Sequence, residues 1–506
     1  MIKLFQYKLF TGEFQDEGSD TEEEEHEEYT AKEFKISVKG QVSYFLSGTG
    51  ISVDYGDGES VEEQNYDENS DWVEYYYPDY YDYDDTSMCE ERIVTFSGEI
   101  QDIQFSSDGP IRIITPFTKE MANITSMANR FENSNITEIP AGIFDNMPNV
   151  VTFEGCFNGC GNLESVPANL FRYNTKAENF SNCFNGCENL ESVPANLFRY
   201  NTKAENFSNC FNRSGIQTIP ANLFRYNTKA ENFSKCFENC NSITEIPPGL
   251  FDSCENAENF YSCFAYCWNL RTIPKGLFDS CTNATNFTEC FSTSGISKIP
   301  EGLFDKCKNA EYFGQCFQSC NEITSIPARL FAGKSSVHDD VMSGWSGFEG
   351  CFQYCRKLKS VPAGLFLGCS GVNSFQFCFG GCTSLESIAG DAFSGCESAE
   401  NFYSCFESCA ALTGIPSGLF RDCLYASNFM SCFSGCSVLA SVPADLFESC
   451  QHLGNVSYCF QNCAALGGNA PEIWTKSNVS SSTLHSGCFR NCTNLDNYAD
   501  IPADWK

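Results

Sequence analysis

Histidine, basic residues and catalytic motifs are scarce or missing in this chain. Only 4 histidines occur among 506 residues, and their scatter disfavours both nucleophile–histidine pairs and histidine-rich zinc sites. The sequence contains no P-loop, no G-x-S-x-G and no H-E-x-x-H. We therefore expect a protein that is not an enzyme and that has no catalytic residues, no metal ligands and no cofactor.

The shortage of positive charge excludes further classes. Lys and Arg number 31 against 66 Asp and Glu, which gives a net charge of -35. Nucleic acids and anionic membranes both attract basic surfaces, so we expect neither as a partner. No run of about 18 apolar residues is present, which argues against membrane insertion. The opening "MIKLFQYKLFTGEFQDEGSD" lacks the apolar core and the small-residue cleavage site of a secretory signal, so none is expected.

The negative charge is concentrated at the N-terminal end. Residues 1–110 hold 29 Asp and Glu against 6 Lys and Arg, a net charge of -23. Residues 1–30 end in an acidic run and are predicted to be flexible, or to anchor the chain to a partner protein. Residues 31–120 alternate polar with Val, Ile, Phe and Tyr between glycine turns, which predicts a small β-sandwich-like domain.

An acidic insert rich in tyrosine interrupts this β-domain. Tyrosine offers rigid amphipathic contact area, so the insert is either a docking surface or a disordered loop. "DENSDWVE" supplies the first three positions of a calcium loop with Asp67, Asn69 and Asp71, but Trp72 and Pro78 depart from that pattern. Calcium binding by the insert stays open. The candidate binding residues are Tyr75, Tyr76, Tyr77, Tyr80 and Tyr81.

From about residue 121 the chain repeats itself with a period of 26 or 27 residues. "NLESVPANLFRYNTKAENFSNCFN" occurs twice, and a proline follows Ile or Val in most units, with Ala389 in its place between Pro362 and Pro416. A constant period of this length is typical of stacked supersecondary units. An eight-residue insertion lengthens one unit near "GKSSVHDDVMSGW". The prolines are Pro140, Pro167, Pro194, Pro220, Pro247, Pro274, Pro300, Pro327, Pro362, Pro416 and Pro443.

Each unit offers an apolar set that a single copy cannot bury, so the coils must stack. Proline and Asn-Gly steps favour short extended segments and turns over long helices. "LESV" and "AENFSNCF" are predicted as the extended segments, and "PANLF" and "CFNGC" as turns or short helical corners. We therefore predict a leucine-rich-repeat-like solenoid of short parallel strands over residues 121–463, with a C-terminal cap over residues 464–506.

Cysteines recur in three positions of the coil, which we call the first, second and third cysteine slots. The first slot precedes a Phe, the second follows that Phe by three residues, and the third follows "LF" by three. Asn174, Asn201 and Asn227 occupy the third slot in the early copies. We favour a ladder of small buried thiols, with stacked disulfides and zinc as alternatives. Members of the first two slots include Cys183, Cys187, Cys263, Cys267, Cys432 and Cys436.

The insertion is the most variable part of the repeat and is a second candidate surface for binding. Surface loops tolerate insertions and often carry the contacts that define function. Its candidate binding residues are Lys334, His338, Asp339, Asp340 and Trp345.

The coil motif resembles the BspA-like leucine-rich repeats. "FNGCENLESVP" fits F-x-x-C-x-x-L-x-x-(I/V)-P, and the likeness extends over about residues 122–492. "ISVDYGDGES" is similar to a strand-turn found in small β-domains of such proteins. The family's rhythm has "MF" where this chain has "CF". The resemblance implies a solenoid used for adhesion or partner binding on surfaces of gut bacteria.

Three functions follow as hypotheses. The first is a virion component, a fibre or receptor-binding protein of a phage, that contacts a protein or glycan receptor on a cell surface. The second is a bacterial cell-surface adhesin. The third is a scaffold that assembles with copies of itself as a homo-oligomer. The corresponding locations are the virion or the cell surface, with the cytoplasm as the alternative.

Overall fold

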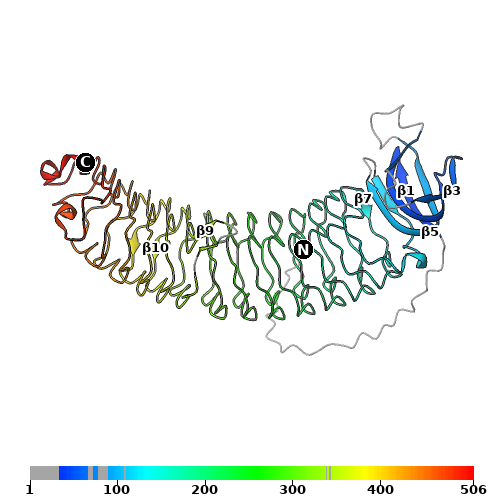
Figure 1. Ribbon diagram of the computed structural model, residues 1–506, viewed down its shortest axis with the longest axis horizontal. Helices are drawn as coiled ribbons and strands as arrows, with labels where there is room; N and C mark the ends of the chain where they lie inside the picture. Colours follow the sequence, from blue (N-terminus) through cyan, green and yellow to red (C-terminus); the bar gives the residue numbers. More distant parts are fainter. Residues whose placement is uncertain (1–32, 67–71, 78–88, 107–109, 338, 341–343) are drawn as a thin grey trace, which may run out of the picture.

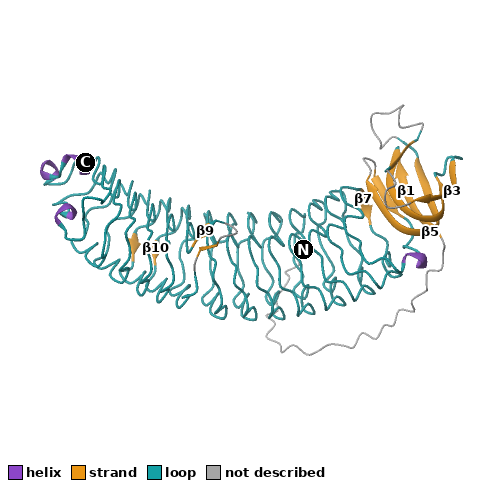
Figure 2. Ribbon diagram, viewed as in Figure 1, coloured by secondary structure: helices purple, strands orange, loops and turns teal. Residues whose placement is uncertain are grey.

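A curved stack of coils forms most of the molecule, with a β-sheet at its N-terminal end (Figure 1). The computed structural model describes residues 33–66, 72–77, 89–106, 110–337, 339–340 and 344–506. The predicted acidic segment 1–30 lies outside these residues. Figure 2 shows that long strands are confined to the N-terminal end and that the coils are built from loops and turns.

The described strands at the N-terminal end form one sheet rather than two separate ones. Its order is β3-β2-β5-β1-β6-β7, with β4 paired to the outer side of β2. All pairs are antiparallel except β6 with β7. The strands are β1 (Glu33–Lys39), β2 (Gln41–Asp54), β3 (Ser60–Tyr66), β4 (Val73–Tyr76), β5 (Glu91–Ser106), β6 (Pro110–Ile113) and β7 (Asn135–Glu138).

Two glycines lie where the pairing of the two longest strands, β2 and β5, becomes irregular. The register of β2 against β5 shifts on both sides of Gly48 and Thr49. A Cβ at Gly48 would lie 2.1 Å from the Glu99 carbonyl oxygen, and a Cβ at Gly98 would lie 2.4 Å from that of Gly50. Only glycine permits so close a backbone approach, and both glycines also have positive φ.

The sheet and the solenoid share one continuous core. β7 comes from the first coil and pairs in parallel with β6, so the sheet itself extends into the repeat. Phe34 stacks on Phe117 with ring centroids 4.8 Å apart, and Phe105 stacks on Phe131 at 5.9 Å. The sheet therefore covers the apolar end of the stack, as a terminal cap must. The boundary at residue 120 stays a prediction.

Extended backbone within each coil is shorter than the sequence predicts. In the copy "AENFSNCFNG", Asn179 makes single parallel bridges to Thr152 and Asn206, whereas Ser181–Gly186 form a turn. "PANLF" also forms a turn, and among the described residues no coil corner of the stack up to residue 463 is helical. Further short strands are β8 (Asp339–Asp340), β9 (Trp345–Ser346), β10 (Ser360–Val361) and β11 (Ser387–Ile388).

The turn still hydrogen-bonds to the next coil, which explains why a full strand is not needed. Asn182 and Gly186 have φ values of 56° and 71°. This left-handed conformation favours Asn and Gly and keeps alternate N–H groups directed along the stack. Asn182 donates to Ser208 O at 2.8 Å and Gly186 to Asn212 O at 2.7 Å.

The recurrent N-x-S/T triplets also have a structural role in these turns. The side-chain oxygen of Asn179 accepts the Ser181 N–H at 2.9 Å, and those of Asn206 and Asn232 do the same one coil later each. Asparagine is suited to this because its short side chain caps the N–H two residues ahead.

Three columns of stacked phenylalanines fill the core. Phe251 lies parallel to Phe224 and Phe278, at centroid distances of 6.0 and 6.1 Å. Phe233 and Phe260 from the adjacent column meet its ring at a steep angle, at 4.9 and 5.1 Å. These stacked and edge-to-face arrangements are the favoured geometries for aromatic pairs, so each ring is held by neighbours in two coils.

The C-terminal end of the stack is covered by aromatic side chains. Trp505 is buried, stacks on His485 at 4.5 Å and meets Trp474 edge-on at 6.0 Å. Trp474 in turn packs against Phe489, the last ring of its column. These contacts support the proposal of a cap over residues 464–506.

The described helices are single 3-10 turns: η3 (Lys119–Met121), η4 (Ile473–Thr475), η5 (Tyr498–Asp500) and η6 (Ala503–Trp505).

Candidate functional site

The cysteines of the repeat are buried and unpaired. All six members named above as a ladder have exposed fractions of 0% and free thiols. Second-slot thiols also donate hydrogen bonds to the coil before them: Cys187 Sγ lies 3.3 Å from Phe157 O, and Cys267 Sγ lies 3.1 Å from Phe237 O. The second slot therefore adds a hydrogen bond to a buried carbonyl, which the prediction of small buried thiols did not include.

Burial keeps these thiols protonated and unreactive. Desolvation raises the pKa of Cys160 to about 12 and raises that of Cys187 well above its ordinary value. A nucleophilic cysteine needs the opposite, a lowered pKa and access to solvent. The thiol columns therefore stabilise the stack and offer no reaction centre.

The third slot is a donor position shared by three residue types. Asn227 donates to Phe198 O at 3.1 Å and to Asn201 O at 2.9 Å. Where cysteine replaces asparagine, Cys369 Sγ approaches Phe331 O at 3.1 Å. Each residue type supplies at least one N–H or S–H to carbonyls in the preceding coil, which explains why the early copies can carry Asn in this slot.

Lys334 occupies this same slot and is buried, contrary to its predicted place on the binding surface. Its ammonium group donates to Phe304 O at 2.7 Å and to Cys307 O at 2.6 Å. Only 4% of the residue is exposed, and burial lowers its pKa. Lys334 is therefore a structural donor that replaces Asn or Cys at the start of the insertion.

The rest of the insertion is described only in part. His338 lies outside the described residues. Asp339 and Asp340 form β8, which pairs antiparallel with Ser346 and Trp345 of β9. Trp345 is half-buried and lies over Gly314, where an added Cβ would be 2.6 Å from the Trp345 Cβ. The described part of the insertion thus contains one short antiparallel strand pair, and its binding role stays a prediction.

The predicted tyrosine surface is divided between exposed and buried positions. Tyr76 is 37% exposed, and Tyr75 is half-buried against Tyr55 with ring centroids 3.8 Å apart. Tyr77 is fully buried and donates to Tyr55 O, so it cannot belong to a contact surface. Tyr80 and Tyr81 lie outside the described residues, as do the calcium-loop candidates Asp67, Asn69 and Asp71.

A recess in the solenoid surface arises from a one-residue deletion. Units of 26 residues have Ser-Gly-Ile where others have Cys-x-x-Leu, as at Ser294–Ile296. In the shortened turn Gly295 is buried, and its N–H donates to Cys267 O at 3.2 Å. A Cβ at Gly295 would lie 2.1 Å from Trp268 O, so no larger residue fits there. The deletion thus creates a hollow of ≈ 580 Å³ between the neighbouring coils.

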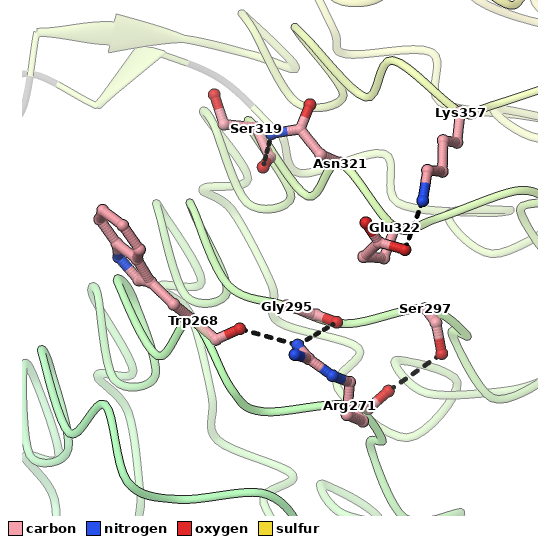
Figure 3. Close-up of polar contacts among 8 residues, drawn as sticks. All are labelled: Trp268, Arg271, Gly295, Ser297, Ser319, Asn321, Glu322 and Lys357. Atoms are coloured by element: carbon pink, nitrogen blue, oxygen red, sulfur yellow. Dashed lines mark hydrogen bonds and ion pairs between the residues drawn. The ribbon is translucent and has the colours of Figure 1, made fainter.

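The recess has one aromatic wall and a polar rim. Trp268 is 63% exposed, the most exposed of the large apolar side chains on the described surface. Figure 3 shows Trp268 and Arg271 on one side of Gly295, with Ser319, Asn321 and Glu322 across the opening. The lining residues are Trp268, Arg271, Thr293, Ser294, Gly295, Ser297, Ser319, Asn321 and Glu322.

The polar groups of the recess are held in place by neighbouring atoms. Arg271 Nη1 donates to Trp268 O at 2.7 Å and to Gly295 O at 3.2 Å, which fixes the guanidinium plane. Glu322 Oε2 lies 2.7 Å from Lys357 Nζ. That hydrogen bond holds the pKa of Glu322 below its usual value, so the carboxylate is charged at neutral pH. Arg271, Glu322 and Lys357 together leave one net positive charge beside the opening.

Sequence reasoning missed Trp268, Arg271 and Gly295. One signal was the shortened Ser-Gly-Ile step, which occurs at Ser214–Ile216 and again three coils later at Ser294–Ile296. A tryptophan in a position that the other coils fill with small, polar or charged residues, such as Gly161, Glu188 and Arg356, was the second signal. Neither could be interpreted without knowing that the two features meet in space.

Two findings limit the chemistry of the described surface. Among the residues that the structure describes, no group of three or more His, Cys, Asp or Glu side chains is placed to hold a metal ion. The same residues include no helix with the length and apolar character needed to cross a bilayer.

These features define a class of protein: a leucine-rich-repeat-type solenoid with a shallow, partly aromatic surface recess. Residues 427–503 match the model of the BspA type leucine rich repeat region, in 6 copies. The predicted resemblance to BspA-like repeats is therefore confirmed. No curated protein sequence matches the chain.

Several solved structures resemble the chain at low sequence identity. A structure of the Toll–Spatzle complex from Drosophila has a TM-score of 0.36 and 14% identity, covering 74% of this chain and 44% of that one. A leucine-rich repeat protein from Eubacterium ventriosum has a TM-score of 0.27 and 13% identity, covering 77% and 92%. The plant receptor RGFR1, in complex with RGF2, has a TM-score of 0.28 and 15% identity, covering 79% and 61%. The chain thus spans less than two thirds of the Toll and RGFR1 chains.

Proposed function

We propose that this chain is a non-enzymatic binding protein whose solenoid presents a recognition surface to a receptor on a cell. The observation that carries the proposal is the presence of large aromatic side chains exposed on a rigid core. Trp268, Tyr354 and Tyr425 are 63%, 43% and 58% exposed, whereas the stacked phenylalanine columns of the core are buried almost completely. Exposed Trp and Tyr on a fixed backbone are typical of contact residues, because they bury much area at little cost in conformational entropy.

The buried chemistry supports binding over catalysis. The thiols are protonated donors within the stack. Glu322 is paired with Lys357, and Arg271 Nη1 is held by two backbone carbonyls. The residues that line the recess can recognise a ligand, and they include no cysteine or histidine.

The place where this binding protein acts is a finer part of the proposal, with two alternatives. The likeness to BspA-type repeats favours a cell-surface adhesin, and a receptor-binding protein of a phage virion is the other form. In either case the N-terminal region would join the solenoid to an anchoring protein. Immunogold labelling of intact cells and of purified virions distinguishes these forms by where the chain is found.

Binding to intact cells tests the proposed function. Fluorescently labelled chain should bind at least one cell type in a panel of gut bacteria and epithelial cells, saturably and in competition with unlabelled chain. Replacing Trp268, Tyr354 and Tyr425 together by Ala should weaken that binding at least tenfold. A Thr202→Ala and Thr228→Ala control, also at exposed positions, should bind as the wild type does. Concentration-dependent self-association without saturable binding to any cell would instead support the scaffold hypothesis.

A further inference from the structure

The recess at Gly295 combines a shortened turn with an exposed tryptophan, Trp268. The same deletion occurs at Gly215, where an added Cβ would lie 2.2 Å from Glu188 O and the N–H bonds Cys187 O at 3.1 Å. The two shortened turns are therefore alike in backbone. The side chains beside them differ, because Glu188 and Glu191 stand at the positions of Trp268 and Arg271. The aromatic wall at Gly295 is thus not needed to form the shortened turn.

We propose that the Gly295 recess is an oligosaccharide site in which a sugar ring stacks on Trp268. This inference rests on the proposed binding function and names its ligand class. A pyranose ring has an apolar C–H face and a rim of hydroxyl groups. The exposed indole matches the C–H face, since an aromatic side chain presents a flat apolar surface.

The rim of the recess supplies partners for the hydroxyl groups. Asn321 offers an amide, Ser319 and Thr293 offer hydroxyls, and the Glu322 carboxylate accepts hydrogen bonds. The volume of ≈ 580 Å³ falls within the range of about 300–1,000 Å³ that small ligands occupy. An apolar peptide side chain would leave most of these polar groups without partners, which disfavours a purely apolar ligand.

The local charge favours a sugar that carries a carboxylate over a neutral one. Arg271 lines the recess, and its Nη1 is fixed by two carbonyls. A planar guanidinium held in this way is suited to a carboxylate, because it loses little side-chain freedom on binding. Lys357 balances Glu322 at 2.7 Å, so the positive charge of Arg271 is left over at the opening.

A glycan array tests this inference directly. The purified full-length chain is applied to printed neutral and carboxylated oligosaccharides, and the affinity of each retained sugar is then measured by calorimetry. We expect retention of at least one oligosaccharide, an affinity loss of at least tenfold for Trp268→Ala, and a smaller loss for Arg271→Gln that is confined to carboxylated sugars. The matched control is Leu484→Ala, which removes a large apolar side chain of similar exposure, 60%, elsewhere on the surface and should leave sugar binding unchanged.

Each result either supports the inference or overturns it. Retention that depends on Trp268 but not on Leu484 supports a sugar site. The comparison of neutral with carboxylated sugars then shows whether charge contributes to binding. An array on which nothing is retained, or equal loss in both variants, overturns it. If the Trp268→Ala variant still binds cells saturably and as strongly as the wild type does, the two proposals separate: unchanged cell binding supports the proposed function, and it contradicts the sugar site. Absence of cell binding would reject the function itself.

Discussion

Replacing Phe251 by alanine should lower the free energy of unfolding by about 3–5 kcal/mol. The ring is 1% exposed and is packed between Phe224 and Phe278 along its column. Its removal leaves a cavity that the neighbouring coils cannot close without breaking their backbone ladder. Because coils contact only their neighbours, the two halves of the stack should also unfold at separate denaturant concentrations.

Urea unfolding followed by circular dichroism, with reductant present, measures this effect. Phe251→Leu keeps most of the volume and loses mainly the aromatic contacts, so it should cost on the order of 1 kcal/mol. Tyr425→Ala, at a position 58% exposed, should change stability by no more than about 0.5 kcal/mol. If Phe251→Ala unfolds at the wild-type urea concentration, the stacked core described above is wrong.

Replacing Lys334 by methionine should destabilise the chain by about 2–3 kcal/mol, since two buried carbonyls would lose their donor. These are Phe304 O and Cys307 O, which lie 2.7 and 2.6 Å from the lysine nitrogen. Lys334→Asn is the matched variant, because Asn227 makes both equivalent bonds in its own coil. The asparagine variant should be at least as stable as the wild type, as it also removes a charge from a buried site.

Thermal or urea unfolding of the two variants separates the donor role from an ionic one. Loss of stability in Lys334→Met with recovery in Lys334→Asn identifies hydrogen-bond donation as the role of this slot. Equal destabilisation by both substitutions would show that the positive charge itself is required, which contradicts the donor account.

The sequence predicted the repeat because the information is local and recurs in every copy. Phe180, Cys183, Phe184 and Cys187 recur in nearly every unit, and a single coil cannot bury them, so a stacked core follows directly. The turn ladder was harder to foresee. Asn182 and Gly186 were interpreted as part of an extended segment and a corner, whereas their left-handed backbone keeps the chain hydrogen-bonded through the turn.

The least predictable residues were those whose burial or partners depend on neighbouring coils or strands. Lys334 was assigned to the surface as part of the insertion, and only its place in the third slot reveals its carbonyl partners. Tyr77 was grouped with its exposed neighbours, although strand alternation turns Tyr76 outward and Tyr77 inward. The recess at Gly295 depends on Trp268, which precedes it by one coil, so it becomes visible only when the coils are stacked.

Counting thiols is the most direct test of the central claim, that stacked coils bury their cysteines as reduced donors. The native chain, held without reductant, is treated with N-ethylmaleimide and weighed by mass spectrometry before and after unfolding. We predict no rapid labelling of the native chain and 32 labels once it is unfolded, one for each cysteine. Fewer labels after unfolding would reveal disulfides, and rapid labelling of the native chain would reveal exposed thiols. Either result would contradict the stacked, thiol-lined core.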